Sequence, residues 1–480
     1  MKHRRPIAAV AAALAAGFCI ADTSRAANLD EVYQRALRND PQIREAEATR
    51  QADLEGKPEA LANLLPQLNA NGSYVRDEAS SKTPEIFSNP TIQNPTAVAT
   101  PNFYANSKTD IGQWQVQLRQ TIFRWDQISA LKQANVKVAQ AEVDYRAAQQ
   151  DLILRTAQRY FGVLAAKDAL EAAESSHEAI ARQLDQADQR YSVGLIAITD
   201  VQEARAAADN AAATVIAAKR ALATAEEQLR ELTGETFPEL TKPGEDMPLV
   251  SPEPADEDQW VRGALDQNLQ LTSARLGADI AAENIDIARA GHYPTLDLVA
   301  GRSGSSTTGD QVQALSGGGY PTQVFPLTAN ANSSDKQIGL QMTFPIFAGG
   351  GTSAKVREAV YRQRAAREHL ELTARETERA TRDAYLGVVS DISHVKALRQ
   401  ALESAEVALK ATDAGYEVGT RTAVDVLLAR QRLYQAQSDY LKSRYDYVVD
   451  VLTLEQAAGT LDATRLNRVN GWLNQSVKVR

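Results

Sequence analysis

The chain has 480 residues, a length that accommodates two or three ordinary domains. Acidic residues outnumber basic ones by 61 to 52, so the chain lacks the excess of Lys and Arg that nucleic-acid binding requires. Five His and one Cys leave little material for a metal or thiol site, and aromatic residues make up only 6% of the chain. Composition therefore predicts long, closely packed helices and a protein that is not an enzyme and uses no metal, cofactor or nucleic acid.

Residues 1–26 have the pattern of a secretory signal peptide. A basic start precedes an apolar run over 7–20, which is shorter than a bilayer-spanning helix, and Ser24 and Ala26 supply the small residues of a cleavage site. We expect an exported protein whose mature chain begins near Ala27. No later stretch approaches 18 consecutive apolar residues, so the sequence predicts no transmembrane helix.

The remaining sequence contains the same pattern twice. Tyr191-Ser192-Val193-Gly194 recurs 225 positions later as Tyr416-Glu417-Val418-Gly419, and at the same shift Asp200-Val201 matches Asp425-Val426. This duplication predicts two structural repeats joined by a linker that is rich in proline and acidic residues. The predicted segments are a first repeat over 27–236, the linker over 237–258, a second repeat over 259–460 and a C-terminal tail over 461–480.

Each repeat contains two segments in which polar and apolar residues alternate, the pattern of a β-strand. Alternation is unbroken over 113–119 and 338–344, with glutamine prominent on the polar face and aromatic residues near the ends. A soluble sheet with one solvated face gives the same alternation, but the glutamine-rich faces and terminal aromatics favour strands that contact outer-membrane lipid. The predicted strands cover 66–75, 108–123, 295–302 and 337–346.

Long polar segments lie between the two strands of each repeat. The segments from Arg76 to Ser107 and from Arg302 to Lys336 are rich in Ser, Thr, Asn, Gly and Pro. Because the long loops of outer-membrane barrels lie on the extracellular side, we predict that both segments are loops that face outside the cell.

The rest of each repeat is predicted to be helical. A helix opens each repeat, over about 29–64 and 256–291, and a much longer one follows the strands. Residues 126–191 contain no proline and one glycine, so this helix would reach roughly 100 Å at 1.5 Å per residue. Apolar side chains at three- and four-residue spacing predict antiparallel coiled-coil packing. The predicted long helices cover 126–191 and 353–416, and the shorter helices after the Tyr-x-Val-Gly turns cover 200–233 and 425–458.

Four strands per chain are too few to close a barrel, and open sheet edges are not tolerated in hydrocarbon. Since the smallest bacterial barrels have about eight strands, several identical chains would share one barrel with cyclic symmetry. Three chains give twelve strands, although dimers and tetramers also satisfy this argument.

The two turns resemble those of a known family. Gln183-Leu184-Asp185-Gln186 with Arg190-Tyr191-Ser192-Val193-Gly194, and Gly415-Tyr416-Glu417-Val418-Gly419 with Val424-Asp425-Val426-Leu427, resemble the inner turns of TolC-type outer-membrane channels. The resemblance implies a mixed α and β membrane protein, a homotrimeric 12-stranded outer-membrane β-barrel that continues into a long α-helical coiled-coil tunnel in the periplasm. It also implies a passive exit duct in the outer membrane of a Gram-negative bacterium. Its partners would be a periplasmic adaptor protein and an inner-membrane transporter, in type I protein secretion or drug efflux.

The resemblance also assigns a constriction. In a threefold duct an inward-facing side chain occurs three times, so Asp425 would form a ring of carboxylates that attracts cations. The family has a second acidic residue one helical turn later, where this chain has Leu428. The resemblance therefore implies one acidic ring followed by an apolar one. The local alternative for Asp425 is that it caps the helix that begins there.

A latch at the gate is implied in the same way. Tyr416 and Arg421 match the inner-turn residues that bond to a neighbouring outer helix pair, and Thr199 and Asp200 match their acceptors. Charge-assisted hydrogen bonds of this kind are among the stronger ones. The alternative is an exposed surface contact worth about 0–1 kcal/mol.

Other functions explain parts of the sequence. A dedicated multidrug-efflux channel would share every feature above. A soluble periplasmic coiled-coil scaffold would explain the helices and the signal, but it would not need alternating strands with aromatic ends. A secreted hydrolase would explain export, but no nucleophile–base or carboxylate constellation is evident.

Overall fold

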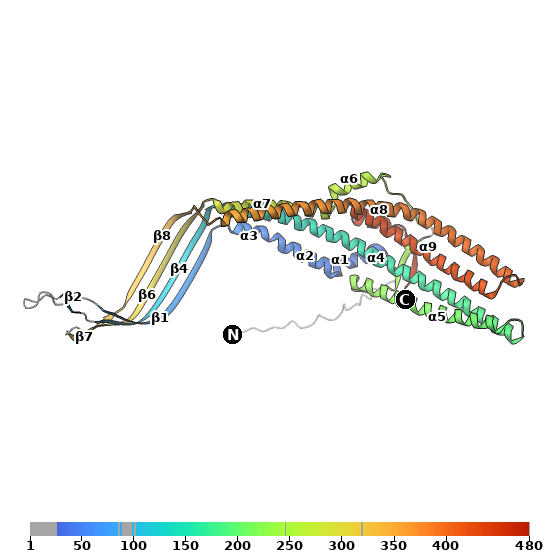
Figure 1. Ribbon diagram of the computed structural model, residues 1–480, viewed down its shortest axis with the longest axis horizontal. Helices are drawn as coiled ribbons and strands as arrows, with labels where there is room; N and C mark the ends of the chain where they lie inside the picture. The colour runs from blue at the N-terminus through green and yellow to red at the C-terminus, as the bar shows by residue number, and fades with distance from the viewer. Residues whose placement is uncertain are drawn as a thin grey trace, which may run out of the picture. The chain divides into compact units, whose positions relative to one another are not determined.

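The computed structural model describes residues 26–84, 87–88, 98–99, 102–244, 246–317 and 320–479 (Figure 1). The signal peptide predicted over 1–26 lies, apart from Ala26, outside these residues. The chain divides into two compact units. Unit 1 comprises Met1–Glu47, Tyr145–Leu269 and Ala374–Arg480, and unit 2 comprises Ala48–Asp144 and Gln270–Thr373. The elements are α1 (Leu29–Asn39), α2 (Pro41–Leu54), α3 (Gly56–Ala62), β1 (Gln67–Pro84), β2 (Phe87–Ser88), β3 (Val98–Ala99), β4 (Asn102–Phe123), α4 (Trp125–Ser192), α5 (Ile198–Thr233), β5 (Glu239–Pro243), α6 (Glu257–Gln267), α7 (Leu269–Arg289), the 3-10 turn η1 (Ala290–His292), β6 (Thr295–Gly317), β7 (Tyr320–Thr328), β8 (Ala331–Thr343), α8 (Gly351–Glu417), α9 (Ala423–Ala457), α10 (Ala463–Asn470) and β9 (Leu473–Lys478).

Unit 2 contains an antiparallel sheet of five strands (Figure 1). β1 pairs with β4, β4 pairs with β6, and the other edge of β6 pairs with both β7 and β8. Asp310 pairs with Thr328 of β7 and Thr295 pairs with Thr343 of β8, so both strands have the same register against β6. β7 and β8 are therefore two parts of one strand, and the sheet has four strand positions.

The strands extend well beyond the alternating segments of the sequence. β1 continues to Pro84, β4 begins at Asn102, β6 continues to Gly317, and β7 had no predicted counterpart. The prediction that 76–107 and 302–336 are loops is therefore wrong over most of their described residues. These segments are rich in Ser, Thr and Gly, and they pair through backbone hydrogen bonds, which alternation of polar and apolar side chains does not detect.

The two faces of the sheet differ in polarity. Because the strands pair residue by residue, odd-numbered residues share one face with odd-numbered neighbours, and even-numbered residues share the other. The odd face carries mainly Gln, Asn, Ser and Thr. Exposed apolar side chains gather on the even face: Leu68, Tyr74, Trp114, Ile338, Leu340 and Met342.

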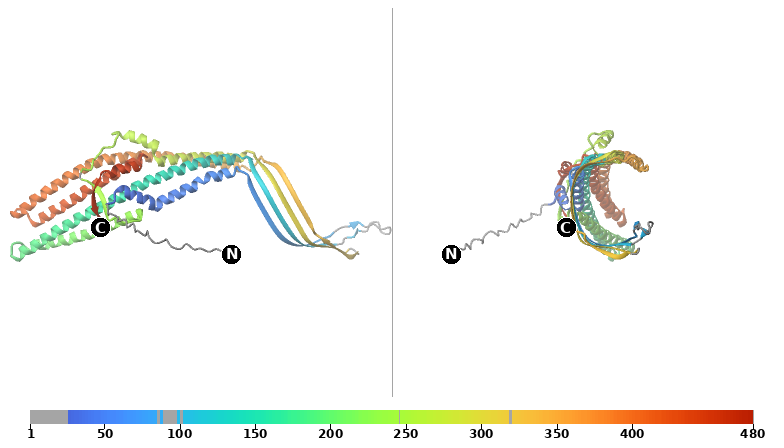
Figure 2. Two further views of the ribbon diagram at one scale, coloured as in Figure 1. Left: turned by 180° about the vertical axis from the view of Figure 1, so that it is seen from behind. Right: turned by 90° about the vertical axis from the view of Figure 1, so that its left-hand side faces the viewer.

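The sheet is curved, with the polar face on the inside of the curve. Over residues 305–312 of β6 the odd residues are half-buried and the even residues are exposed. Seen end on, the strands follow an arc (Figure 2). We call the odd, polar face the concave face and the even, apolar face the convex face. This arrangement is typical of a barrel wall with a wet interior and an oily exterior.

The long helices dominate unit 1 and supply most of its core. Tyr160, Phe161 and Leu164 of α4 are at most 2% exposed, as are Tyr447 and Leu452 of α9. α4 and α8 match the predicted long helices to within two residues at each end. None of the described helices is long and apolar enough to cross a bilayer.

The helix that opens each repeat is interrupted. The predicted single helix over 29–64 is divided into α1, α2 and α3, and its counterpart in the second repeat is divided into α6 and α7. Asp40 and Asn268 both adopt an extended conformation, with ψ of 121° and 127°. At Asp40 the cause is local, because the proline that follows disfavours the helical conformation of the preceding residue.

Three distant segments meet in a small sheet of unit 1. β5 lies in the predicted linker and β9 in the predicted C-terminal tail, and the two strands pair in antiparallel fashion. Ala27, the predicted first residue of the mature chain, bridges to Leu240 in β5. The Tyr160 hydroxyl, 3.2 Å from the Ala27 carbonyl oxygen and also bonded to Thr241, ties this sheet to α4.

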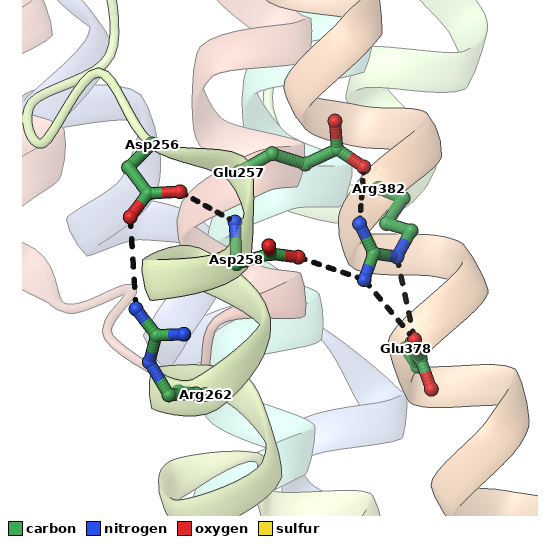
Figure 3. Close-up of polar contacts among 6 residues, drawn as sticks. All are labelled: Asp256, Glu257, Asp258, Arg262, Glu378 and Arg382. Carbon is green, nitrogen blue, oxygen red and sulfur yellow. Dashed lines mark hydrogen bonds and ion pairs between the residues drawn. The ribbon is translucent and has the colours of Figure 1, made fainter.

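A cluster of charged side chains holds α6 against α8 (Figure 3). Arg382 donates to Glu257 at 2.6 Å, to Asp258 at 2.9 Å and to Glu378 at 3.2 Å. The Arg382 side chain is 37% exposed, so solvent weakens each ion pair. The cluster therefore holds α6 on α8, and its role is structural.

Candidate constriction and gate

Each helical hairpin of unit 1 reverses direction through the same turn. Gly194 and Gly419 both have φ of +80°, in the left-handed region that favours glycine. The Leu195 N–H donates to the Arg190 carbonyl at 2.9 Å, and at the equivalent position the Thr420 N–H donates to the Gly415 carbonyl at 2.8 Å. These bonds satisfy carbonyl groups left free at the end of α4 and α8. The repeated Tyr-x-Val-Gly motif thus encodes a helix stop.

An equivalent ion pair braces each hairpin beside its turn. Arg205 of α5 lies 4.0 Å from Asp188 of α4, and Arg430 of α9 lies 3.5 Å from Asp413 of α8. Both members of the second pair are 225 positions after those of the first. The duplication therefore preserves this contact as well as the turn.

Asp425 takes part in the cap of the helix that follows the second turn, in which Thr422 is the N-cap residue of α9 and Asp425 completes the capping box. Its Oδ2 atom accepts hydrogen bonds from the Thr422 N–H and hydroxyl, both at 2.9 Å, while the Asp425 N–H donates to the Thr422 hydroxyl at 3.2 Å. These donors, together with the charge of Arg421, lower the pKa of Asp425. The capping alternative for Asp425 is therefore present in the structure. Its second oxygen, Oδ1, accepts no hydrogen bond from a described residue.

The first turn lacks this cap. The residue equivalent to Thr422 is Ala197, which has no side chain that could accept a hydrogen bond at the start of α5. The Asp200 N–H donates to the Ala197 carbonyl oxygen at 3.2 Å instead. The two repeats thus differ at the N-cap residue, which is Ala197 in the first repeat and Thr422 in the second.

Tyr416 contacts a residue that the sequence had not assigned to the latch. Its hydroxyl accepts a hydrogen bond from Arg190 Nη1 at 2.7 Å, and the Arg190 guanidinium lies 5.2 Å from the centre of its ring. The contact joins the end of α4 to the end of α8. A comparison of the two repeats could have drawn attention to Arg190. The residue before the tyrosine of the turn is Arg190 in the first repeat and Gly415 in the second.

The other predicted latch residues lie at the same end of unit 1. Arg421 and Thr199 are exposed, Asp200 is half-buried, and Leu428 is 44% exposed one helical turn after Asp425. Among the described residues of this single chain, no hydrogen bond joins Tyr416 or Arg421 to Thr199 or Asp200. The latch between helix pairs thus stays a prediction.

The sequence did not predict a pair of carboxyl groups that lies between α8 and α9. Asp391 and Asp450 lie close enough to interact, and Asp446 is close enough to add its charge. Burial and the neighbouring Asp450 raise the pKa of Asp391 to about 7, and burial raises the pKa of Asp450. Alanine occupies the equivalent positions, 166 and 225, of the first repeat. The pair therefore belongs to one repeat only, and one of its members holds a proton near neutral pH.

No group of three His, Cys, Asp or Glu side chains with the spacing of a metal site occurs among the residues that the structure describes. The hairpin ends of unit 1 instead carry charged and hydrogen-bonding side chains. A curved sheet that is polar inside and apolar outside, in a chain that also has long helical hairpins, defines the class of outer-membrane channels.

Comparison with known proteins agrees with this class. The sequence profile of the outer membrane efflux proteins matches residues 32–235 and again 260–460. Outer membrane protein TolC of Escherichia coli K12 is 36% identical over 457 residues, which cover 95% of this chain and 86% of TolC. The alkaline protease secretion protein AprF of Pseudomonas aeruginosa is 27% identical over 439 residues, covering 91% of this chain and 85% of AprF. The crystal structure of CusC has a TM-score of 0.70 at 20% identity, covering 90% of this chain and 92% of CusC.

The chain belongs to the outer membrane efflux protein family. It is an outer-membrane protein of the Gram-negative type that reaches into the periplasm and serves as an exit duct for secretion or drug efflux. The resemblance to TolC-type channels is confirmed. Its relatives are named for the outer membrane, for protease secretion and for transmembrane channel formation.

Proposed function

We propose that three copies of the chain assemble into a passive exit duct with one 12-stranded barrel and one helical tunnel. The main support for a shared barrel is the sheet of unit 2, which has four strand positions, a polar concave face and an apolar convex face. Among the described residues, β1 pairs only with β4, and β7 and β8 pair only with β6. These two edges would meet the edges of neighbouring copies, since hydrocarbon does not tolerate unpaired backbone groups.

Mass measurement of the detergent-solubilised complex tests the assembly. The expected mass is that of three chains plus bound detergent. A monomer, dimer or tetramer would contradict the twelve-stranded barrel, because four strand positions per chain fix the strand count.

The energy for export would come from an inner-membrane transporter, with a periplasmic adaptor protein between transporter and duct. AprF is named as a protein of alkaline protease secretion, which supports type I protein secretion, while the family description supports efflux. Cross-linking in intact envelopes followed by purification of this protein should recover one adaptor and one transporter. Recovery of the protein alone from efficiently cross-linked envelopes would contradict the tripartite arrangement.

At the periplasmic end, Asp425 would form a ring of three carboxylates, followed by a ring of Leu428. The free Oδ1 atom of Asp425 and the exposure of Leu428 support this proposal. The cation preference of the duct would then depend on the charge of Asp425.

The capping bonds determine which substitution tests the ring. Asp425→Ala removes the charge and the carboxylate half of the capping box, whereas Asp425→Asn removes the charge but keeps an oxygen that can accept from Thr422. Both variants should reduce cation over anion permeability in planar bilayers. Only Asp425→Ala should also lower stability, by about 1 kcal/mol. Unchanged selectivity in Asp425→Asn would place the filter elsewhere.

A further inference from the structure

Two cationic side chains lie directly opposite one another on the convex face of the sheet. Arg302 of β6 pairs in register with Lys336 of β8, and both residues are even-numbered and exposed. Like charges at directly opposed positions are destabilising by roughly 0.2–1 kcal/mol. Arg302 and Lys336 therefore destabilise the sheet unless an anion binds beside them and neutralises their charge.

Two other cations of the convex face have carboxylate partners. Arg76 is bonded to Asp110 at 2.8 Å, and Lys108 lies 3.3 Å from Glu78 on the neighbouring strand. Neither Arg302 nor Lys336 forms an ion pair with any carboxylate among the residues that the structure describes. Arg302 and Lys336 thus stand side by side on the convex face without a carboxylate partner.

An aromatic ring completes the group. Trp114 of β4 lies across Gly304 of β6, where an added Cβ atom would come within 2.6 Å of the indole Nε1 atom. The Arg302 guanidinium is 5.9 Å from the Trp114 ring. The indole N–H, the guanidinium and the Lys336 ammonium are all hydrogen-bond donors and include no acceptor. Three adjacent strands therefore present a set of donors that suits a phosphate or other anion.

The position along the strand selects the source of the anion. Arg302 is seven residues beyond Thr295, where β6 begins after the helical segment. At about 3.3 Å per residue and a tilt of 35–45°, this is a rise of about 16–19 Å in an apolar band about 25 Å tall. Arg302 thus lies past the midplane, and long basic side chains extend from such depths towards the headgroups. Further along, Ser306 and Ser334 are small and leave space on the same face.

We propose that Arg302, Lys336 and Trp114 bind the phosphate of a phosphorylated glycolipid in the outer leaflet of the outer membrane. The choice of leaflet rests on the proposed function, in which the helical segment is periplasmic and the far end of the sheet faces outside. Trp114 stacks beside the sugar–phosphate headgroup, and the two cations pair with its charge. In a trimer the site occurs three times around the barrel.

Native mass spectrometry of the detergent-solubilised protein tests the site, with diphosphorylated lipid A and its dephosphorylated form as probes. The double variant Arg302→Ala/Lys336→Ala should bind lipid A about tenfold more weakly than the wild type, because two charge-assisted contacts are lost. Arg302→Lys/Lys336→Arg should bind as the wild type does. Lys108→Ala is the matched control, since it removes a convex-face cation that already has a carboxylate partner, and it should leave binding unchanged.

Several outcomes would overturn the proposal. One is equal binding of lipid A by the wild type and the double alanine variant, and another is equal binding of the dephosphorylated lipid. Equally tight, variant-sensitive binding of phosphatidylglycerol would refute the glycolipid, and similar binding of inorganic phosphate would refute a lipid site. The same spectra report the oligomeric mass. A complex that is not a trimer contradicts the proposed function, whereas a normal trimer with unchanged lipid binding contradicts this site alone.

Discussion

The carboxyl pair between α8 and α9 makes the stability of unit 1 depend on pH. Burial and the proximity of Asp450 raise the pKa of Asp391 from 3.8 to about 7. A carboxyl group whose pKa is raised on folding contributes stability below its unfolded pKa, and this contribution is lost as pH rises from about 4 through about 7. Above pH 7 Asp391 loses its proton, and the nearby Asp450 and Asp446 disfavour its charge.

The magnitude follows from the size of the shift. A change of the Asp391 pKa from 3.8 to about 7 corresponds to about 4 kcal/mol, since a tenfold change in an equilibrium constant is about 1.36 kcal/mol. Both side chains are only half-buried, so solvent screening reduces the repulsion at high pH to about 1–2 kcal/mol. Asp391→Asn should therefore stabilise the protein by about 1–2 kcal/mol at pH 8.5 and change it little at pH 5, where the carboxyl group is already neutral.

Thermal unfolding of the detergent-solubilised protein at pH 5 and pH 8.5 measures this difference. The wild type should lose stability at the higher pH, and Asp391→Asn should lose less. Glu403→Gln is the matched control, because it removes one charge from an exposed position of the same helix. An equal pH response of the wild type and Asp391→Asn would refute the assignment of the proton to this pair.

Further predictions concern the gate, the orientation and the small sheet. The double variant Arg421→Ala/Tyr416→Phe should assemble normally and should have a higher single-channel conductance. Arg190→Ala alone should have the same effect, because it removes the donor to Tyr416. Unchanged conductance would mean that these contacts do not hold the gate closed. A cysteine at Ser88 should react with an impermeant reagent on intact cells, and reaction only after the outer membrane is broken would reverse the orientation. Tyr160→Phe should lower unfolding stability by about 1–3 kcal/mol, since buried acceptors lose their donor; calorimetry showing no loss would mean that water replaces the hydroxyl.

The sequence by itself determined the features whose cause is local. The long helices follow from the absence of proline, the apolar spacing and the glycine stops, so α4 and α8 begin and end close to their predicted limits. The cap by Asp425 was also foreseeable, because Thr422 and Asp425 have the spacing of a capping box. The duplication added a second copy of each signal, which is why the family could be recognised from the turns.

Only the tertiary structure decided the features that join distant residues. The Ser- and Thr-rich parts of β1 and β6 become strands through backbone pairing, which no local pattern records. β5 and β9 meet from positions more than two hundred residues apart, and Arg190 meets Tyr416 across 226 positions. The opposition of Arg302 and Lys336 depends on strand register. A shift of one residue would place one of the two cations on the other face, so three-dimensional pairing alone creates this site.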